Sequence, residues 1–403
     1  MSLRTLDELE DTADGLRLLV RTDLNSPVEG GVVQDNKRFE RHAETIAELA
    51  ERGHRVAVMA HQGRPGRDTY VSLEQHAEVL AEHLNRDVDF VADVHGEDAI
   101  AALRNLDSGE ILLLENVRFS EDELADRTAE EHAESEFVTA LSAEVDAYVN
   151  DAYSAAHRAH ASLVGFPQVL NSYAGRVMAA EYEYNTSIRE REFEGSVVMV
   201  LGGTKADDLI AVMERLDDRV DTFLTGGILG ELFLRAAGYD VGYDVEGSNL
   251  FDDQWEAERE TIEGLLGRYG DRIRLPADLA FADEDGERVE VRVKDAEKTH
   301  PFLDVGEETI DSYATVVESA EAVFVKGALG VFEDERFSRG TVGILERIAA
   351  TECFSVVGGG DTARAIDLYG LAEDDFSHVS IAGGAYARAL TGESLPAIEA
   401  LRR

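Results

Sequence analysis

Residues 40–60 read ERHAETIAELAERGHRVAVMA, an amphipathic segment that runs directly into a short apolar one. In the first part, Ala43, Ile46 and Ala50 recur at three- and four-residue steps, the spacing of a helix with one buried face. The second part, RVAVMA at 55–60, is typical of a buried strand. A helix followed at once by such a strand predicts right-handed βαβ units and a mostly parallel sheet.

The same alternation extends outward through both halves of the chain. Further apolar runs in the first half predict strands at 16–20, 88–92, 110–114 and 147–150. In the second half the corresponding runs lie at 196–203, 221–227, 271–276, 322–327, 354–360 and 378–384, and most of them end on glycine. We therefore expect an α/β fold with two Rossmann-like domains, each a mostly parallel sheet flanked by helices.

A long polar segment, SYAGRVMAAEYEYNTSIRERE at 172–192, separates the two halves and predicts a connecting hinge helix. We expect an N-terminal domain at 1–171, a C-terminal domain at 193–388 and a tail at 389–403. Since a chain of 403 residues exceeds what one hydrophobic core usually serves, two domains also agree with its length.

The charge balance is strongly acidic: 83 acidic residues stand against 38 basic ones, of which only five are lysines. Such a surface repels itself at low ionic strength, so we expect a halophilic protein that needs salt to fold. The same charge argues against nucleic acid as a partner.

No apolar run reaches the length of a membrane span, and the N-terminus lacks the regions of a signal peptide. With a single cysteine, these features predict a cytoplasmic protein without a membrane partner.

In open parallel sheets, ligands bind beyond the carboxyl ends of the strands. Most of the polar residues near these strand ends in the first half are arginines or histidines. The full set is Arg21, Asp23, Asn25, Arg38, His61, Arg64, Arg118, His157, Arg158 and His160. A lone arginine in so acidic a chain would be a surface residue paired with an acid. Several at one sheet edge predict a site for a small, doubly anionic ligand, because guanidinium groups bind phosphate and carboxylate with paired hydrogen bonds.

Two smaller patterns at the same edge have alternative interpretations. His157 and His160 are spaced as metal ligands, but no third ligand accompanies them, which favours anion binding or a structural role. Glu115 and Asp151 are candidates for a catalytic acid pair. We interpret them instead as acids that orient the neighbouring arginines, because acids beside guanidinium groups stay ionised.

The strand ends of the second half are rich in glycine: they include 202–203, 226–227, 327–330, 358–360 and 383–384. Glycine lets backbone amides approach phosphates, and a helix N-terminus behind the loop adds its dipole. Asp361 and Thr362 lead into a helix, so we expect one of them to cap it while Asp361 faces a magnesium ion. The segment 358–363 also matches the dinucleotide fingerprint loosely, which leaves a nicotinamide-dependent oxidoreductase as the main alternative, although no ribose-binding acid follows.

Eight segments together resemble the phosphoglycerate kinase family over essentially the whole chain: in order, VRTDLNSP, HQGRP, LLLENVRF, NDAYSAAHRAHAS, LGGTK, VKGALGVFE, VVGGGDTARA and HVSIAGGA. The resemblance implies a monomer that transfers phosphate, with Mg²⁺, between ATP and 3-phosphoglycerate to give ADP and 1,3-bisphosphoglycerate. A carboxylate acceptor is already ionised at neutral pH, so the protein needs to supply alignment, charge neutralisation and water exclusion rather than a general base. Ligands on different domains further imply hinge closure.

The resemblance also assigns roles residue by residue. The residues that match the phosphoglycerate site and its basic patch are Arg21, Asp23, Asn25, Arg38, His61, Gln62, Gly63, Arg64, Arg118, His157, Arg158 and His160. Those that match the nucleotide site are Gly203, Lys205, Gly227, Lys326, Glu333, Gly359, Gly360, Asp361 and Thr362. Within these sets, Arg38 and Lys205 match catalytic positions, Glu333 the ribose-binding acid and Asp361 the acid linked to magnesium.

The chain departs from the family pattern at two positions of the nucleotide half. Leu209 replaces a lysine that contacts phosphate, and Lys326 replaces an asparagine. One hypothesis is that Lys326 supplies the charge that position 209 has lost; the other is lineage drift with an exposed Lys326. The loss at position 209 also leaves open a second alternative, a binder of phosphorylated metabolites that has lost its activity, although Arg38, Lys205 and Asp361 argue against it.

Overall fold

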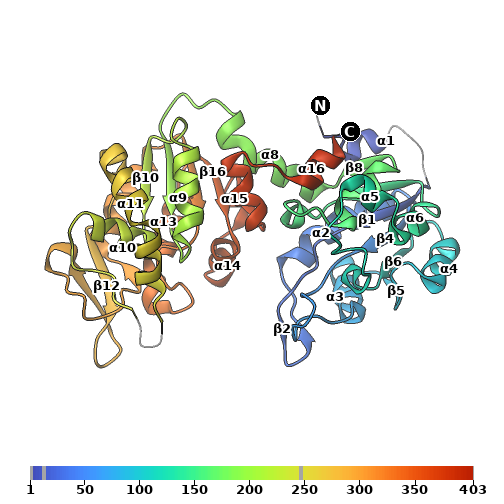
Figure 1. Cartoon of the computed structure of the whole chain (residues 1–403), viewed down its shortest axis with the longest axis horizontal. Helices are drawn as coiled ribbons and strands as arrows, with labels where there is room; N and C mark the ends of the chain where they lie inside the picture. Colours follow the sequence, from blue (N-terminus) through green and yellow to red (C-terminus); the bar gives the residue numbers. More distant parts are fainter. Residues whose placement is uncertain (1–2, 11–14, 245–247, 403) are drawn as a thin grey trace. The chain divides into compact units, whose positions relative to one another are not determined.

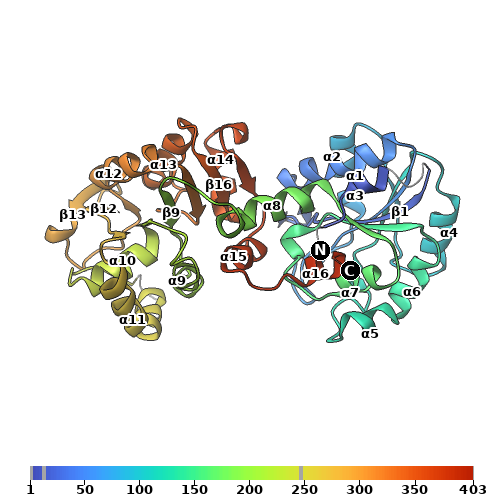
Figure 2. The same cartoon turned by 90° about the horizontal axis from the view of Figure 1, so that it is seen from above.

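The computed structural model describes residues 3–10, 15–244 and 248–402 (Figure 1). The chain divides into two compact units, one formed by Met1–Glu183 with Ser394–Arg403 and the other by Tyr184–Glu393. Each unit contains a six-stranded sheet with helices on both faces (Figure 2). The predicted α/β fold with two mostly parallel sheets is confirmed.

The sheet of the first unit has the strand order β5-β6-β4-β1-β7-β8, and all its strand pairs are parallel. Its strands are β1 (Arg17–Arg21), β4 (Arg55–Met59), β5 (Asp89–Val91), β6 (Ile111–Leu114), β7 (Ala147–Asn150) and β8 (Ser172–Ala174). The helices that cover it are α1 (Leu6–Glu10), α2 (Lys37–Glu51), α3 (Glu74–Leu84), α4 (Glu97–Asn105), α5 (Ala129–Ala133), α6 (Glu136–Ser142) and α7 (Ala161–Val164). Figure 2 shows α2 and α3 on one face and α5, α6 and α7 on the other.

Helix α2 illustrates how the sequence builds this layer. Asn36 caps the helix, since its side-chain oxygen accepts a hydrogen bond from the Arg38 amide at 3.0 Å. On the inner face, Ile46 and Leu49 are fully buried, in the same apolar cluster as Val56 of β4. The cap and the buried stripe therefore place Arg38, in the first turn, at the carboxyl edge of the sheet.

The connecting helix α8 (Arg176–Glu190) begins four residues later than the sequence predicts, because residues 172–174 form strand β8 and pair with β7. The prediction of a helix from residue 172 is therefore wrong at its start. The buried Asp151 carboxylate fixes the actual start: its Oδ1 accepts hydrogen bonds from the amides of Val177 and Met178 at 2.9 and 3.2 Å. These amides are among the four that a helix N-terminus leaves without an internal partner.

The sheet of the second unit has the order β11-β10-β9-β15-β16-β17, again with parallel pairs only. Its strands are β9 (Val197–Leu201), β10 (Thr222–Thr225), β11 (Ile273–Arg274), β15 (Ala322–Lys326), β16 (Phe354–Gly358) and β17 (His378–Ser380). Its helices are α9 (Ala206–Arg215), α10 (Gly227–Ala236), α11 (Leu250–Tyr269), α12 (Glu307–Glu318), α13 (Arg339–Ala349), α14 (Gly360–Leu368) and α15 (Gly384–Thr391).

Two small antiparallel sheets were not predicted. One has the order β13-β12-β14, from β12 (Asp278–Ala282), β13 (Arg288–Arg292) and β14 (Asp304–Val305); the other pairs β2 (Val28–Glu29) with β3 (Val32–Val33). Their strands are short or polar, so they lack the apolar runs that reveal the parallel strands. After α15, the final helix α16 (Pro396–Leu401) packs in the first unit, where the Ala397 amide donates to the Ala156 carbonyl at 3.1 Å.

Among the described residues, we find no helix whose length and apolar character suit a membrane crossing.

The start of α8 generates a stability prediction at Gly175. A Cβ added there would lie 2.1 Å from Asp151 Oδ1 and 2.7 Å from the Asp151 Cβ, and Asp151 is fully buried and hydrogen bonded. We expect Gly175→Ala to lower the free energy of unfolding by roughly 1–3 kcal/mol, measured by urea denaturation in molar KCl.

The matched control is Gly264→Ala in α11, where an added Cβ meets no atom within 4 Å. This control should be neutral or gain about 1 kcal/mol, because alanine favours a helix over glycine. Equal unfolding midpoints for the two variants would contradict the role of Gly175.

Candidate active site

An open pocket of about 440 Å³ lies at the carboxyl edge of the first sheet. The predicted residues that line it are Asn25, Arg38, His61, Gln62, Gly63, Arg64, Arg118 and Arg158. Arg67, which the sequence analysis missed, also lines it. The sequence feature that could have indicated Arg67 is its position in the loop HQGRPGR, three residues after Arg64. Five guanidinium groups around one opening suit a small ligand with two negative charges.

Arg21 lies behind this pocket rather than in its wall, and it orients His61. Arg21 is buried, and its Nη2 lies 3.1 Å from His61 Nδ1. Burial lowers the pKa of His61 well below its ordinary value despite the nearby Asp23, and the charge of Arg21 acts in the same direction. His61 is therefore neutral. Since a guanidinium group only donates, Nδ1 accepts from Arg21 and the Nε2–H of His61 is left to donate to a ligand.

Asp23 also lies behind the pocket and holds its cations in place. Burial acts to raise the pKa of this carboxyl, but the charge of Arg38 and a hydrogen bond from Ser154 lower it well below the ordinary value. Arg38 Nε lies 3.4 Å from Asp23 Oδ2, and Arg38 Nη1 donates to the Asn25 carbonyl. Asp23 thus stays ionised and fixes Arg38 at the rim.

Gln62 and Gly63 shape the pocket through their backbone and side-chain contacts. The buried Gln62 side chain exchanges two hydrogen bonds with the Ser26 backbone, at 2.8 and 3.0 Å, so it joins the loops that follow β1 and β4. Gly63 has φ 65°, and an added Cβ would lie 2.2 Å from the Thr69 carbonyl oxygen. Its amide donates to Asn25 Oδ1 at 2.9 Å, which leaves the Asn25 amide group to face the pocket.

Arg118 and Arg158 give the pocket an excess of positive charge. Burial, followed by the charges of Arg158 and Arg21, lowers the pKa of Arg118 to about 10. Burial likewise lowers the pKa of Arg158, with the nearby Arg64 and Arg21 acting in the same direction. Arginines that disfavour one another's charge in this way form a site prepared for an anion, which relieves the repulsion when it binds.

Two predicted histidines lie outside the lining of the pocket. His160 Nδ1 lies 3.6 Å from Oε1 of the buried Glu123, and His157 Nε2 accepts a hydrogen bond from Arg158 Nε at 3.3 Å. Their position favours support of the pocket over direct contact with a ligand.

The interpretation of Glu115 and Asp151 as acids that orient arginines is wrong. Glu115 accepts hydrogen bonds from the Ser72 hydroxyl at 2.7 Å and from the amides of Leu73 and Asn116 at 2.9 and 2.6 Å. Asp151 binds His42 and the first turn of α8, as described above. Both carboxylates are used to fix loops, because each lies next to free backbone amides.

In the second unit, a pocket of about 280 Å³ lies at the carboxyl edge of the sheet, where the glycine-rich loops meet. Its lining includes Gly202, Gly203, Lys205, Asp208, Leu209, Lys326, Gly359, Gly360 and Asp361. Several of these glycines are required by neighbouring backbone rather than by a ligand. An added Cβ at Gly202 would lie 2.1 Å from the Ala328 carbonyl oxygen, and one at Gly327 would lie 2.1 Å from that of Gly202.

The loop before α14 is built to expose backbone amides. Gly359 is the N-cap residue with φ 107°, and no side chain caps the helix. The expectation that Asp361 or Thr362 caps it is wrong, because the Thr362 hydroxyl instead donates backward to the Gly358 carbonyl at 2.9 Å. Since a helix N-terminus carries partial positive charge, the uncapped amides are suited to phosphate oxygens.

Lys326 lines the same pocket as Lys205 and Leu209, and its side chain is half-buried. The alternative of an exposed Lys326 is therefore wrong. Burial lowers the pKa of Lys326 and the charge of Lys205 acts in the same direction, whereas Asp208, Asp207 and Asp361 raise it. Two lysines thus lie around one small pocket.

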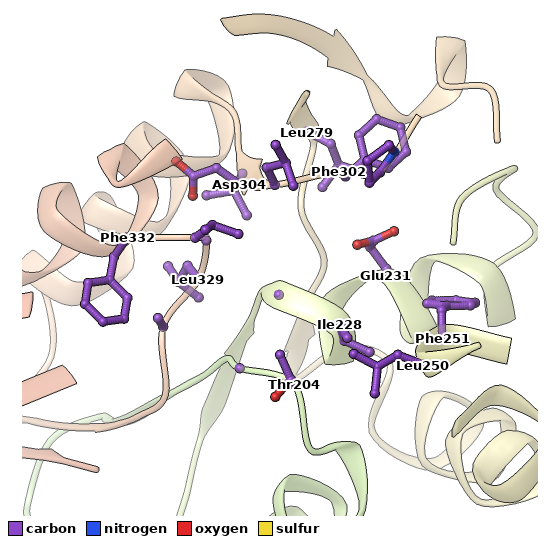
Figure 3. A pocket seen from close by; sticks show the side chains of 18 of the residues that line it. Thr204, Ile228, Glu231, Leu250, Phe251, Leu279, Phe302, Asp304, Leu329 and Phe332 are labelled. Atoms are coloured by element: carbon purple, nitrogen blue, oxygen red, sulfur yellow. The ribbon is translucent and has the colours of Figure 1, made fainter. Parts of the chain in front are cut away.

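A second pocket of about 420 Å³ adjoins this one and is mainly apolar (Figure 3). Its apolar walls include Ile228, Leu250, Phe251, Leu279, Phe302 and Leu329. The predicted residues Gly203, Gly227, Glu333 and Asp361 also line it, so Asp361 borders both pockets of this unit. The volume lies in the range of small-molecule sites, and an apolar cavity beside a phosphate-binding loop suits a nucleoside.

The geometry agrees with the sequence comparisons. A family model described as phosphoglycerate kinase matches residues 6–393. The chain belongs to the phosphoglycerate kinase family. As a member of the family it is an enzyme, a phosphotransferase with a carboxyl group as acceptor, that acts in glycolysis.

Phosphoglycerate kinases from halophilic archaea are among its relatives. The enzyme of Halorubrum lacusprofundi is 64% identical over 400 residues, with 99% of this chain and 98% of the relative covered. That of Haloarcula marismortui is 61% identical over 404 residues, with both chains covered completely. The crystal structure of phosphoglycerate kinase from Pyrococcus horikoshii OT3 has a TM-score of 0.90 at 34% identity, with 98% of each chain covered.

Membership of the phosphoglycerate kinase family excludes the alternative of a nicotinamide-dependent oxidoreductase.

Among the residues that the sequence did not reveal, those in the walls of the apolar pocket are the most important. Phe302 and Leu279 come from the segment around the small antiparallel sheet, where no motif marks them. Glu231 lies in α10, and its side chain gave no signal because glutamate is expected on a helix surface.

Proposed function

We propose that the arginine-lined pocket of the first unit binds 3-phosphoglycerate and that the pockets of the second unit bind ATP. We further propose that the two ligand-binding domains span residues 1–171 and 193–388. The observation that carries the proposal is the group of five arginines around one opening, in a chain of net charge −45. The phosphate and carboxylate of 3-phosphoglycerate match such paired donors. Arg38 and Lys205 are proposed as the catalytic residues, and Glu333 as the acid that binds ribose.

The second unit suits a nucleotide carried with Mg²⁺. Asp361 is exposed, in the first turn of α14, and borders both pockets. Because Mg²⁺ at such sites takes one or two protein carboxylates together with substrate phosphates, one suitably placed acid fits the ion. We propose that Asp361 holds it. The ion, when bound, neutralises charge on the phosphates.

The proposed reaction needs no general base, because the accepting carboxylate is already ionised. Arg38, Arg118 and Arg158 bind and align the phosphoglycerate, while Lys205 and the exposed amides before α14 neutralise charge on the transferring phosphoryl group. In-line transfer requires the two ligands to meet, so we propose that hinge bending accompanies the reaction and excludes water. We further propose a cytoplasmic, halophilic monomer.

A phosphotransfer assay in molar KCl tests this function. The purified protein should transfer phosphate from ATP to 3-phosphoglycerate, and Arg38→Ala should lower kcat by roughly 10²–10³-fold, because it removes a positioned charge. Arg86→Ala, at an exposed position outside the pocket, is the control and should retain full activity. Binding of both ligands without turnover would instead identify a binder that has lost its activity.

Salt dependence gives a separate prediction. The net charge of −45 is repulsive, and screening of this repulsion stabilises the folded state. The urea midpoint and the specific activity should therefore both rise between 0.1 and about 3 M KCl, where the Debye length falls well below 10 Å. Full stability and activity in dilute buffer would count against halophilic adaptation.

The position of Lys326 generates a further prediction about nucleotide binding. If this side chain supplies phosphate charge that Leu209 cannot, Lys326→Asn should raise the KM for ATP roughly tenfold, because it removes a charge-assisted hydrogen bond. The KM for 3-phosphoglycerate should not change, since its pocket lies in the other unit. Adding Leu209→Lys to this variant should restore the KM for ATP. Near-normal turnover and ATP binding by Lys326→Asn would reject the hypothesis.

A further inference from the structure

Glu231 is a buried acid in the wall of the apolar pocket, and no described feature of the reaction uses it. It lies in α10, one turn after Gly227, and is 8% exposed. Phe251 and Phe302 line the same pocket, and Figure 3 shows the Glu231 carboxyl group extending from α10 toward the side where Phe302 and Leu279 lie. An acid in such surroundings is costly unless it is paired or neutral.

The hydrogen bonds of Glu231 leave one of its oxygens available. The Gly242 amide donates to Oε2 at 3.2 Å. Within residues 15–244 and 248–402 no donor or cation contacts the other oxygen, Oε1, and the pocket lining contains no lysine, arginine or histidine. The charge that acts on it is that of another acid, Asp244, and Asp304, Glu333 and Asp361 also line the pocket.

These surroundings decide the protonation state. Burial raises the pKa of Glu231 to about 8, the Gly242 hydrogen bond opposes this shift, and the negative charge of Asp244 adds to it. The acid is thus mainly neutral at pH 7. Because Oε2 accepts from Gly242, the proton lies on Oε1, which becomes a hydrogen-bond donor inside an otherwise apolar cavity.

We propose that Glu231 is a specificity-determining residue for the nucleotide, and that its Oε1–H donates a hydrogen bond to a ring nitrogen of adenine. The inference rests on the proposed nucleotide site, whose phosphate loop and apolar cavity place the base near α10. Adenine offers ring nitrogens as acceptors and an amine at position 6 as donor. The amine at position 6 can donate a hydrogen bond to the second lone pair of Glu231 Oε2. A carboxylate, which only accepts, would lose the bond to the ring nitrogen.

The experiment removes one acceptor at a time from the ligand. Dissociation constants for ADP and for its 1-deaza, 3-deaza and 7-deaza analogues are measured by calorimetry in molar KCl with fixed free Mg²⁺. For the unmodified protein, one of the three analogues should bind about five- to tenfold more weakly than ADP, the effect of one hydrogen bond. For Glu231→Leu, ADP and all three analogues should bind equally.

Glu231→Gln is the matched variant, since its carbonyl accepts from the Gly242 amide while its Nε2–H donates to the base. It should keep the weaker binding of the same analogue. The ADP affinity of the unmodified protein should fall as pH rises through about 8, because the deprotonated acid cannot donate, and Glu231→Gln should remove this dependence. A conserved melting temperature shows that each variant is folded.

Equal binding of ADP and all three analogues by the unmodified protein would overturn the inference, as would a weakened analogue that stays weak in Glu231→Leu. A purely structural role, in which Glu231 only holds the turn at Gly242, gives these same results. Failure of the unmodified protein to bind ADP at all would instead overturn the proposed nucleotide site. The affinity for 3-phosphoglycerate, measured alongside, should be the same in every variant.

Discussion

The arginine-lined pocket of the first unit depends on positive charges that buried acids hold at close range. Besides burial, the charges of Arg158 and Arg21 lower the pKa of Arg118, and those of Arg64 and Arg21 lower the pKa of Arg158. Asp23 and Glu123, both buried, offset part of this repulsion from behind. The two acids also join loops at this sheet edge: Asp23, after β1, accepts a hydrogen bond from Ser154, after β7, and Glu123, after β6, accepts hydrogen bonds from Ser162.

The glycine-rich pocket of the second unit is built differently. Its loops approach one another backbone to backbone, as at Gly202 and Gly327, and charge enters through two lysines and an uncapped helix rather than through a group of arginines. Backbone amides fit phosphates of any nucleotide. In the proposed nucleotide site, the apolar cavity would therefore recognise the base, and its walls come largely from segments outside the glycine-rich loops.

The sequence was sufficient for the parallel sheets because strands such as β4 and helices such as α2 carry strong periodic patterns. It was also sufficient for most residues of the arginine-lined pocket, since the carboxyl ends of neighbouring parallel strands meet at one edge. It failed where the outcome depends on partners far along the chain. The strand at 172–174 follows from pairing with β7, and the role of Asp151 follows from the amides of Val177 and Met178. The buried position of Glu231 depends on the cavity formed by Phe302 and Phe251.

The hydrogen bonds of Asp151 extend further than the start of α8. The Asp23 amide donates to His42 Nε2 at 3.2 Å, so His42 carries its proton on Nδ1 and donates it to Asp151 at 2.8 Å. Gly175 must remain without a side chain for Asp151 to fit. Asp151, His42 and Gly175 therefore each limit which residues the other two positions can hold. These residues are therefore expected to change together in evolution: a lineage that replaces His42 should also change Asp151 and Gly175.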